Sequence, residues 1–155
     1  MTITIAPLPP ERRHLLAPLI EAYAAEMRET LAGSQPASGA EAAAMLAADT
    51  RTEVLAAADA DGIVAFAIFF DLPEAVFARR CGALDDLFVR PDRRGRGIAR
   101  RMIDALLETG RARGWSHLRW IVPEGDRGAI ALYERIAERA DWRSYVIRLD
   151  RTASL

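Results

Sequence analysis

Residues 87–99 read Leu87-Phe88-Val89-Arg90-Pro91-Asp92-Arg93-Arg94-Gly95-Arg96-Gly97-Ile98-Ala99. This stretch passes from an apolar, β-prone run through a glycine-rich turn into the start of an amphipathic helix. Glycines let the backbone approach a ligand closely, and the unpaired N–H groups at the start of a helix favour an anion. The stretch therefore predicts an anion-binding loop whose geometry suits a pyrophosphate.

The spacing within this loop disfavours two other phosphate-binding patterns. A Walker loop needs Lys and then Ser or Thr after its second glycine, and a Rossmann loop needs a third Gly or Ala further along. Neither pattern is present. A solvated basic turn that joins a strand to a helix remains an alternative. Nucleic-acid binding is disfavoured because no aromatic residue interleaves the nearby arginines, which are Arg93, Arg94, Arg96, Arg100 and Arg101.

Apolar periodicity on both sides of the loop predicts alternating strands and helices. Strands are expected at residues 2–6, 53–58, 63–70, 83–89, 117–122 and 142–149, and helices from Pro9-Pro10 to about residue 31 and at residues 40–48, 97–109 and 128–138. Residues 59–62 carry a hairpin signal, and residues 33–39 have the composition of a loop. A chain of 155 residues with this order predicts one α/β (α+β) domain over residues 1–155.

The composition is that of a soluble globular domain, with 51% hydrophobic and 28% charged residues. All 21 basic residues are Arg and 22 residues are acidic, so no net field favours nucleic acid or an anionic membrane. The first residues lack the pattern of a secretory signal, and no apolar run approaches the ~20 residues of a membrane span, so we expect a cytoplasmic protein. The single cysteine, Cys81, is expected to be a buried, inert thiol without a metal.

A family resemblance is carried by Arg94-Gly95-Arg96-Gly97-Ile98-Ala99, which matches the signature Arg/Gln-x-x-Gly-x-Gly/Ala. From about Ala83 to Tyr133 the sequence resembles the GNAT superfamily of N-acetyltransferases. The resemblance implies a mixed, mostly antiparallel central sheet flanked by helices, acetyl-CoA as cosubstrate and no metal. It also implies a coenzyme site in which main-chain groups of Leu87, Phe88 and Val89 pair with the pantetheine arm, while the pyrophosphate lies against Arg94, Gly95, Arg96, Gly97, Ile98, Ala99 and Arg100.

Two further matches concern the chemistry that the resemblance implies. The run Ala129-Ile130-Ala131-Leu132-Tyr133-Glu134-Arg135 resembles the family segment Ala-x-x-Leu-Tyr-Glu-Lys, in which the tyrosine is the general acid. A phenol with a pKa of about 10 is protonated at neutral pH and could give a proton to the departing thiolate. The alternative for Tyr133 is a packed core aromatic.

The acidic pair in Leu84-Asp85-Asp86-Leu87-Phe88-Val89 resembles the diamine acetyltransferase branch of the family. Asp85 corresponds to the carboxylate that attracts a cationic amine and takes its proton. Neighbours on a strand point to opposite faces unless a bulge intervenes, so Asp86 is expected to face away from Asp85. The alternative for both residues is a solvated strand end or an arginine partner.

The sequence departs from the family pattern at Asp126, seven positions before Tyr133, where family members commonly carry an Asn that helps to hold the coenzyme. A carboxylate there lacks the amide donor, so Asp126 is the weakest member of the predicted coenzyme site. The Gly-Phe that follows the tyrosine in the family is also missing. Glu124 is a second candidate for the acceptor carboxylate. Surface or structural roles are expected for His14 and His117. The tryptophans Trp115, Trp120 and Trp142 are expected to pack, with a place facing the acceptor cleft as the alternative for Trp120.

The sequence therefore predicts an acetyl-CoA-dependent N-acetyltransferase in which the amine attacks the thioester directly in a ternary complex. The acceptor could be polyamine-like, an amino acid, aminoglycoside-like or a protein N-terminus, because the first helix, residues 33–39 and the last strands carry no decodable signature. A noncatalytic acyl-CoA-binding sensor or structural module is the main alternative, and a nucleotide-binding protein is a second. A homodimer is expected by analogy with the family.

Overall fold

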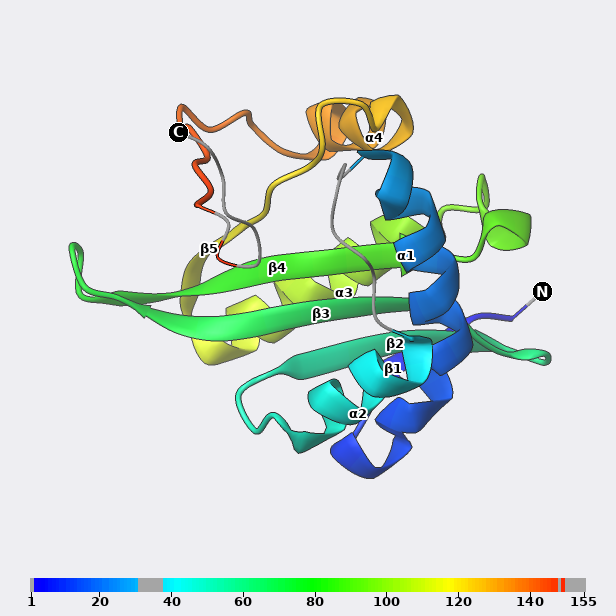
Figure 1. Ribbon diagram of the computed structural model, residues 1–155. Helices are drawn as coiled ribbons and strands as arrows, with labels where there is room; N and C mark the ends of the chain where they lie inside the picture. The colour runs from blue at the N-terminus through cyan, green and yellow to red at the C-terminus, as the bar shows by residue number, and fades with distance from the viewer. Residues whose placement is uncertain (1, 31–37, 148, 150–155) are drawn as a thin grey trace.

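A five-stranded sheet organises residues 2–30, 38–147 and 149, the part of the chain that the computed structural model describes (Figure 1). The strands lie in the order β1-β2-β3-β4-β5. Strands β1 to β4 pair antiparallel with their neighbours, and β5 pairs parallel with β4. The mixed, mostly antiparallel sheet confirms the predicted fold class. The strand bounds are β1 Thr4–Pro7, β2 Glu53–Asp59, β3 Gly62–Glu74, β4 Arg79–Val89 and β5 Trp115–Arg119.

Helices cover both faces of the sheet. Figure 1 shows α3 against one face and α1 and α2 against the other, with α4 near the end of α1. Ser38 caps α2 through a reciprocal capping box with Glu41, which explains why this alanine-rich helix begins where it does. The helix bounds are α1 Ala17–Thr30, α2 Gly39–Ala48, α3 Ile98–Arg113 and α4 Arg127–Ile136, with short 3₁₀ helices η1 Pro10–Leu16 and η2 Pro91–Arg93.

The core consists of two apolar clusters, one on each face of the sheet. Successive residues of a strand point to opposite faces, so β2 and β3 are apolar in nearly continuous runs. On the α3 face the buried residues include Leu55, Ala57, Ala65, Ala67, Phe69, Leu84, Ile98, Met102 and Leu106. On the α1 face they include Leu8, Leu16, Leu19, Val54, Ala56, Phe66, Ile68 and Phe88.

The crossover from β4 through α3 to β5 is packed around Trp115. A Cβ atom added to Gly82 of β4 would lie 2.3 Å from the Trp115 ring, and one added to Gly110 of α3 would lie 2.6 Å from it. Both glycines are therefore required by the close approach of the indole. Gly110 lies inside α3 rather than at its end, and the helix stops at Gly114, which has a left-handed φ of 72°.

Strands β4 and β5 pair only over a short length. The ladder runs from Arg80, opposite Trp115, to Ala83, opposite Arg119. Within the described residues, the remainder of β4 from Leu84 to Val89 has β3 on one side and no strand on the other. This leaves an open strand edge that leads directly to the glycine-rich loop.

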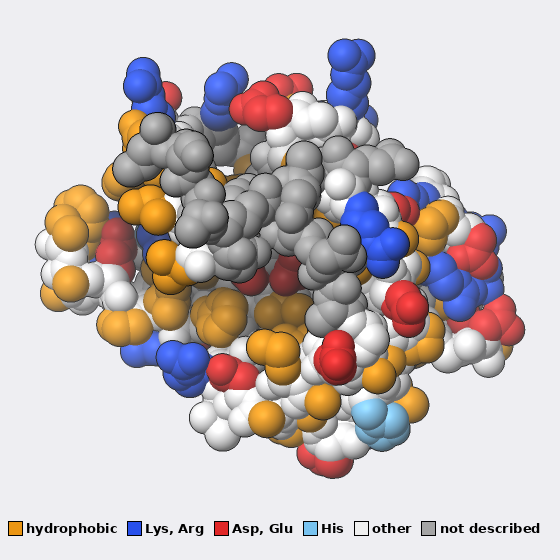
Figure 2. All heavy atoms as spheres, viewed as in Figure 1, with side chains coloured by type: hydrophobic (Ala, Val, Ile, Leu, Met, Phe, Trp, Pro, Cys, Tyr) orange, Lys and Arg blue, Asp and Glu red, His pale blue; other side chains and the backbone are white. Residues whose placement is uncertain are grey.

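The β3–β4 hairpin projects at the opposite end of β4. Val76 and Phe77 at its tip are largely exposed, and Figure 2 shows hydrophobic side chains gathered at that end of the molecule. The guanidinium of Arg79 lies 4.7 Å from the centre of the Phe77 ring. The apolar tip and the glycine-rich loop therefore lie at different ends of the same strand.

The prediction of a final strand at residues 142–149 is wrong for the described residues. Residues 142–147 and 149 are not assigned to a strand, and the side chains of Trp142, Tyr145 and Ile147 are exposed. Alternating apolar residues fit a strand only when a neighbouring strand supplies hydrogen bonds, and no such pairing forms here. Trp142 consequently does not pack as expected.

The other elements are close to their predicted positions. β5 begins and ends earlier than the expected 117–122, since it occupies Trp115–Arg119. The hairpin turn between β2 and β3 and the buried state of Cys81 are confirmed. Most of the loop expected at residues 33–39 lies outside the described residues, and Gly39 already belongs to α2.

Candidate active site

The glycine-rich loop connects the end of β4 to the beginning of α3. Gly95 and Gly97 have φ angles of 71° and 73°, a left-handed conformation that other residues rarely adopt. A Cβ atom at either position would meet no heavy atom within 4 Å, so open space lies beside the loop. Gly97 has no side chain to cap α3, and within the described residues no side chain accepts from the first-turn N–H groups of this helix. The predicted loop thus has room and donors for an anion.

The arginines predicted to contact the coenzyme lie on and beside this loop. The Arg94 guanidinium donates from Nε to the carbonyl of Val89 at 2.9 Å and from Nη2 to Glu26 of α1 at 2.7 Å. It also lies 5.5 Å from the centre of the Phe88 ring. Arg100 pairs with Asp104 one helical turn away, and Arg96 is exposed. Arg94 therefore connects the loop to α1 in this structure.

A β-bulge separates the two acidic residues of β4. Phe69 pairs with Leu84 and Ile68 pairs with Asp86, so Asp85 has no partner on β3. In a regular strand Leu84 and Asp86 would share a face, but the extra residue places them on opposite faces. Asp86 consequently turns toward α1, while Asp85 is exposed at the bulge.

The Asp86 carboxylate is held by a tyrosine of α1. The hydroxyl of Tyr23 donates to Oδ1 of Asp86 at 2.9 Å, and the Tyr23 ring packs against Phe66 and Phe88. Burial raises the pKa of Asp86, the hydrogen bond from Tyr23 lowers it, and the neighbouring charge of Asp85 raises it further, for a net increase. Burial and the charges of Asp86 and Asp85 raise the pKa of Tyr23 strongly. A phenol and two carboxylates thus meet at the open edge of β4.

Tyr133 lies on α4, which Figure 1 shows near the end of α1. Its ring makes an edge-on contact with Trp120, with the ring centres 5.2 Å apart. Burial and the charge of Asp126 raise the pKa of Tyr133, so its phenol is protonated at neutral pH. Tyr133 makes the smallest of the contributions that raise the pKa of Tyr23.

Asp126 has a structural position at the start of α4. Its Oδ1 accepts the N–H of Ala129 at 3.0 Å, which makes it the N-cap of the helix that carries Tyr133. This contact explains why a carboxylate is accommodated where the resemblance predicts an Asn. Glu124 lies in the exposed turn just before it.

The remaining candidates lie outside this cluster. His14 bonds to the carbonyl of Glu11, and His117 bonds to its neighbour Ser116. Across the described ranges, no group of three or more His, Cys, Asp or Glu residues could hold a metal ion. None of the helices described is long and apolar enough to cross a bilayer.

Comparison with known proteins places the fold and this loop in a family. Residues 17–137 match the acetyltransferase (GNAT) family. The chain belongs to that family. By class it is an acetyl-CoA-dependent N-acetyltransferase that acts on an amine.

Solved structures support the assignment over nearly the whole chain. A ribosomal-protein-alanine N-acetyltransferase from Brucella melitensis biovar Abortus 2308 is 38% identical, with a TM-score of 0.82 over 96% of this chain and 99% of its own. The aminoglycoside acetyltransferase HMB0005 from an uncultured soil metagenomic sample is 26% identical, with a TM-score of 0.76 over 96% of this chain and 99% of its own.

A curated relative matches only part of the chain. The thialysine N-epsilon-acetyltransferase of Caenorhabditis elegans is 38% identical over 53 residues, which are 34% of this chain and 33% of that protein. The matched stretch therefore spans about a third of that relative. The names of these proteins describe chemically different amines, so they define the reaction class of this chain but not its acceptor.

Sequence reasoning missed three residues that the structure brings to the site. The sequence alone indicates no role for Tyr23 or Glu26, and it marks Arg93 only as one of several arginines near the loop. Tyr23 and Asp86 are 63 positions apart, and Arg94 and Glu26 are 68 apart. No local pattern marks such pairs. The spacing of Tyr23 and Glu26 by three residues shows only that they share a face of α1.

Proposed function

We propose that this N-acetyltransferase transfers acetyl from acetyl-CoA to a cationic amine by direct attack in a ternary complex. The observation that carries the proposal is the exposed Asp85, beside the Tyr23–Asp86 hydrogen bond, on an open strand edge that leads into the glycine-rich loop, with the phenol of Tyr133 available from α4. This arrangement supplies a carboxylate for the acceptor, a phenol for the leaving group and backbone donors for the coenzyme.

The coenzyme is proposed to bind along β4 and the loop. The N–H groups of residues 95–99 would bind the pyrophosphate, and the main chain of Leu87, Phe88 and Val89 would pair with the pantetheine amides, as a peptide adds to a sheet edge. The left-handed glycines and the open space beside them support this placement. Arg94 and Arg100 already have carboxylate partners, so the backbone supplies the main contacts in our proposal.

Asp85 is proposed to receive the amine. It is exposed at the bulge, whereas the Asp86 carboxylate is half-buried and bonded to Tyr23. Two adjacent carboxylates attract an ammonium group, and Asp85 can take its proton directly or through water before attack. Asp86 adds negative charge, but its bond to Tyr23 leaves it less free to act as the base.

A backbone N–H near Leu87 or Phe88 is proposed to stabilise the oxyanion, and Tyr133 to protonate the sulfur of the leaving thiolate. The raised pKa of Tyr133 supports this role because the acid must hold its proton until the carbon–sulfur bond breaks. The transfer then needs no covalent acyl-enzyme. Cys81 is fully buried on β4 before the bulge, which is consistent with its having no part in the reaction.

The acceptor classes to test follow from the relatives and from the acidic pair. They are protein or peptide N-termini, aminoglycosides, amino acids with a side-chain amine, and polyamines. A thiol-release assay with acetyl-CoA and one member of each class identifies the acceptor. Coenzyme A binding without turnover of any class would instead indicate a noncatalytic acyl-CoA-binding module.

The decisive variants are Asp85→Asn and Asp86→Asn, assayed with the best acceptor. Asp85→Asn should lower kcat and raise the KM of a cationic acceptor, with the coenzyme A dissociation constant nearly unchanged. Asp86→Asn is the matched control, since it removes the same charge one residue away. Loss of turnover in Asp86→Asn but not in Asp85→Asn would show that the base is the other carboxylate.

A further inference from the structure

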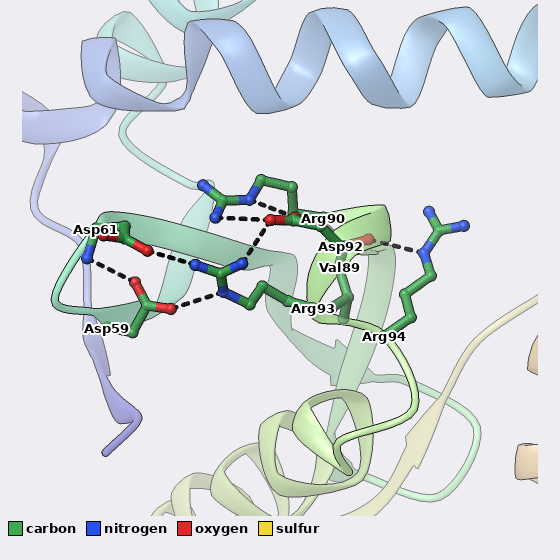
Figure 3. A network of polar contacts seen from close by, with 7 residues as sticks. All are labelled: Asp59, Asp61, Val89, Arg90, Asp92, Arg93 and Arg94. Atoms are coloured by element: carbon green, nitrogen blue, oxygen red, sulfur yellow. Dashed lines mark hydrogen bonds and ion pairs between the residues drawn. The ribbon is translucent and has the colours of Figure 1, made fainter. Parts of the chain in front are cut away.

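Arg93 is the centre of a charge network that connects the glycine-rich loop to the β2–β3 turn (Figure 3). Its Nε donates to Oδ2 of Asp59 at 2.8 Å, its Nη2 donates to Asp61, and its Nη1 donates to Asp92. Asp92 also pairs with Arg90 at 2.7 Å. All three nitrogens of the Arg93 guanidinium are therefore bound to carboxylates.

The network is anchored on a nearly inaccessible carboxylate. The Asp59 side chain is only 3% exposed and that of Arg93 is 14% exposed. The second oxygen of Asp59 accepts the N–H of Asp61 at 2.8 Å, which fixes the turn on which both acids lie. An arginine held in this way cannot swing out to a phosphate without breaking its ion pairs with Asp59, Asp61 and Asp92.

Arg93 lies just before the two left-handed glycines. It ends the short helix η2, where its own N–H bonds to the carbonyl of Arg90 at 2.9 Å. The N–H of Arg90 in turn bonds to the carbonyl of Val64 on β3 at 2.9 Å. Gly95 and Gly97 have more backbone freedom than other residues, so the donors between them need support from outside the loop. The Arg93 guanidinium can supply that support through its bonds to Asp59 and Asp61 on the β2–β3 turn.

We propose that Arg93 is a positioning residue for coenzyme A: its bonds to the β2–β3 turn hold the start of the loop so that the backbone donors of residues 95–99 are set for the pyrophosphate before it binds. The inference rests on the proposed coenzyme site. Donors fixed in advance lose less conformational entropy on binding, and the benefit is seen in affinity. Arg93 contacts no reacting atom in this scheme.

Substitution of the acidic partners of Arg93 tests the proposal, because their negative charge and their anchoring of Arg93 predict opposite effects on coenzyme A affinity. Asp59→Asn with Asp61→Asn removes two negative charges near an anion site, so electrostatics alone would tighten coenzyme A binding. The loss of the anchor should instead weaken it. Arg93→Met removes the anchor and a positive charge together, and Arg93→Lys keeps the charge but lacks the planar fork.

The matched control is Arg113→Met. Arg113 also binds two carboxylates, Glu53 and Asp71, but it lies at the far end of α3. A helix of 16 residues separates the two positions by about 24 Å. Removal of either arginine breaks its ion pairs with carboxylates, although the Arg113 side chain is more exposed, at 38% against 14% for Arg93. Comparing the two variants, with thermal unfolding measured for each, separates a local effect on the loop from a general loss of stability.

The experiment measures the coenzyme A dissociation constant by calorimetry and the KM of acetyl-CoA, with thermal unfolding as a check on folding. Arg93→Met and the double Asn variant should each raise the dissociation constant by about tenfold, with kcat at saturating substrates changed by less than about threefold. Arg93→Lys should lie between Arg93→Met and the wild type. Arg113→Met should bind within about twofold of the wild type.

Several outcomes overturn the proposal. Wild-type affinity in Arg93→Met does so, as does tighter binding in the double Asn variant or equal weakening in Arg113→Met. If Arg93→Met does not fold, Asp61→Asn replaces it, because that side chain is 68% exposed. In Asp61→Asn the backbone amides of residues 94–99 should exchange hydrogen faster than in the wild type. Unchanged exchange rates together with unchanged coenzyme A affinity would contradict the proposal that Arg93 anchors the loop. A wild-type protein that fails to bind coenzyme A would refute the proposed function itself, which is a distinct result.

Discussion

Gly97 and Gly114 flank the same helix and offer a matched pair of substitutions. Both have left-handed backbones, with φ angles of 73° and 72°, and a Cβ at either position would meet no heavy atom within 4 Å. Alanine in this conformation costs about 1 kcal/mol. Gly97→Ala and Gly114→Ala should therefore lower the free energy of unfolding equally. For a domain of this size, Tm should fall by about 2–4 °C in each variant.

Only Gly97 lies in the loop that we propose binds the pyrophosphate. Its new methyl group would occupy the open space beside the loop, and relief of the backbone strain would turn the neighbouring N–H groups away from the ligand. We expect the coenzyme A dissociation constant of Gly97→Ala to rise by at least about tenfold, while that of Gly114→Ala stays within about twofold of the wild type. Calorimetric titration with coenzyme A gives the affinity, and thermal unfolding gives the stability.

Either of two results with Gly97→Ala and Gly114→Ala would refute the assignment of the loop as the pyrophosphate site. Wild-type affinity in a folded Gly97→Ala would exclude the loop as the pyrophosphate site. Equal loss of coenzyme A affinity in both variants would show that strain at either end of α3 disturbs binding, so the result would give no support to the loop as the pyrophosphate site.

Three further substitutions test other parts of the structure. Tyr133→Phe keeps the ring and should lower kcat by about 100-fold at unchanged coenzyme A affinity, whereas full turnover across neutral pH would leave Tyr133 as a packing residue. Asp86→Asn should stabilise the fold at neutral pH, because the raised pKa of Asp86 means that its ionisation destabilises the folded state as the pH rises above the ordinary value of 3.8. The gain in unfolding free energy over the wild type should shrink as the pH is lowered toward 3.8. A lower unfolding free energy than that of the wild type at pH 7 would contradict this prediction. Arg13→Met should lower the free energy of unfolding by about 3 kcal/mol in urea denaturation, because the buried guanidinium donates to the carbonyls of Leu46, Asp49 and Thr52. A change below about 1 kcal/mol would show that these carbonyls find other donors.

The elements with local signals could be predicted from the sequence. The β2–β3 hairpin follows from the turn residues 59–62, and α3 follows from its apolar stripe and from the glycine at its end. The glycine-rich loop has its signal in consecutive residues. Each of these features depends on neighbours in the chain, so the pattern and the structure agree.

Features that depend on a distant partner could not be predicted. The final strand had the right alternation, but a strand exists only where another backbone pairs with it. Tyr23 fits the core pattern of α1, and nothing in that pattern shows that its hydroxyl meets Asp86. Likewise, Arg93 in a basic run suggests a solvated or phosphate-binding side chain until the turn at Asp59 is placed beside it.

The bulge in β4 also bears on how this strand tolerates insertion and deletion. Asp85 is the residue without a counterpart on β3, so a chain shortened by that one residue would keep Leu84 opposite Phe69 and Asp86 opposite Ile68. Both apolar clusters would retain their members on β4, while the exposed carboxylate and the local bend of the strand would be lost. The proposed acceptor carboxylate thus belongs to a supernumerary residue, and a change in chain length at this point can alter the chemistry without repacking the core.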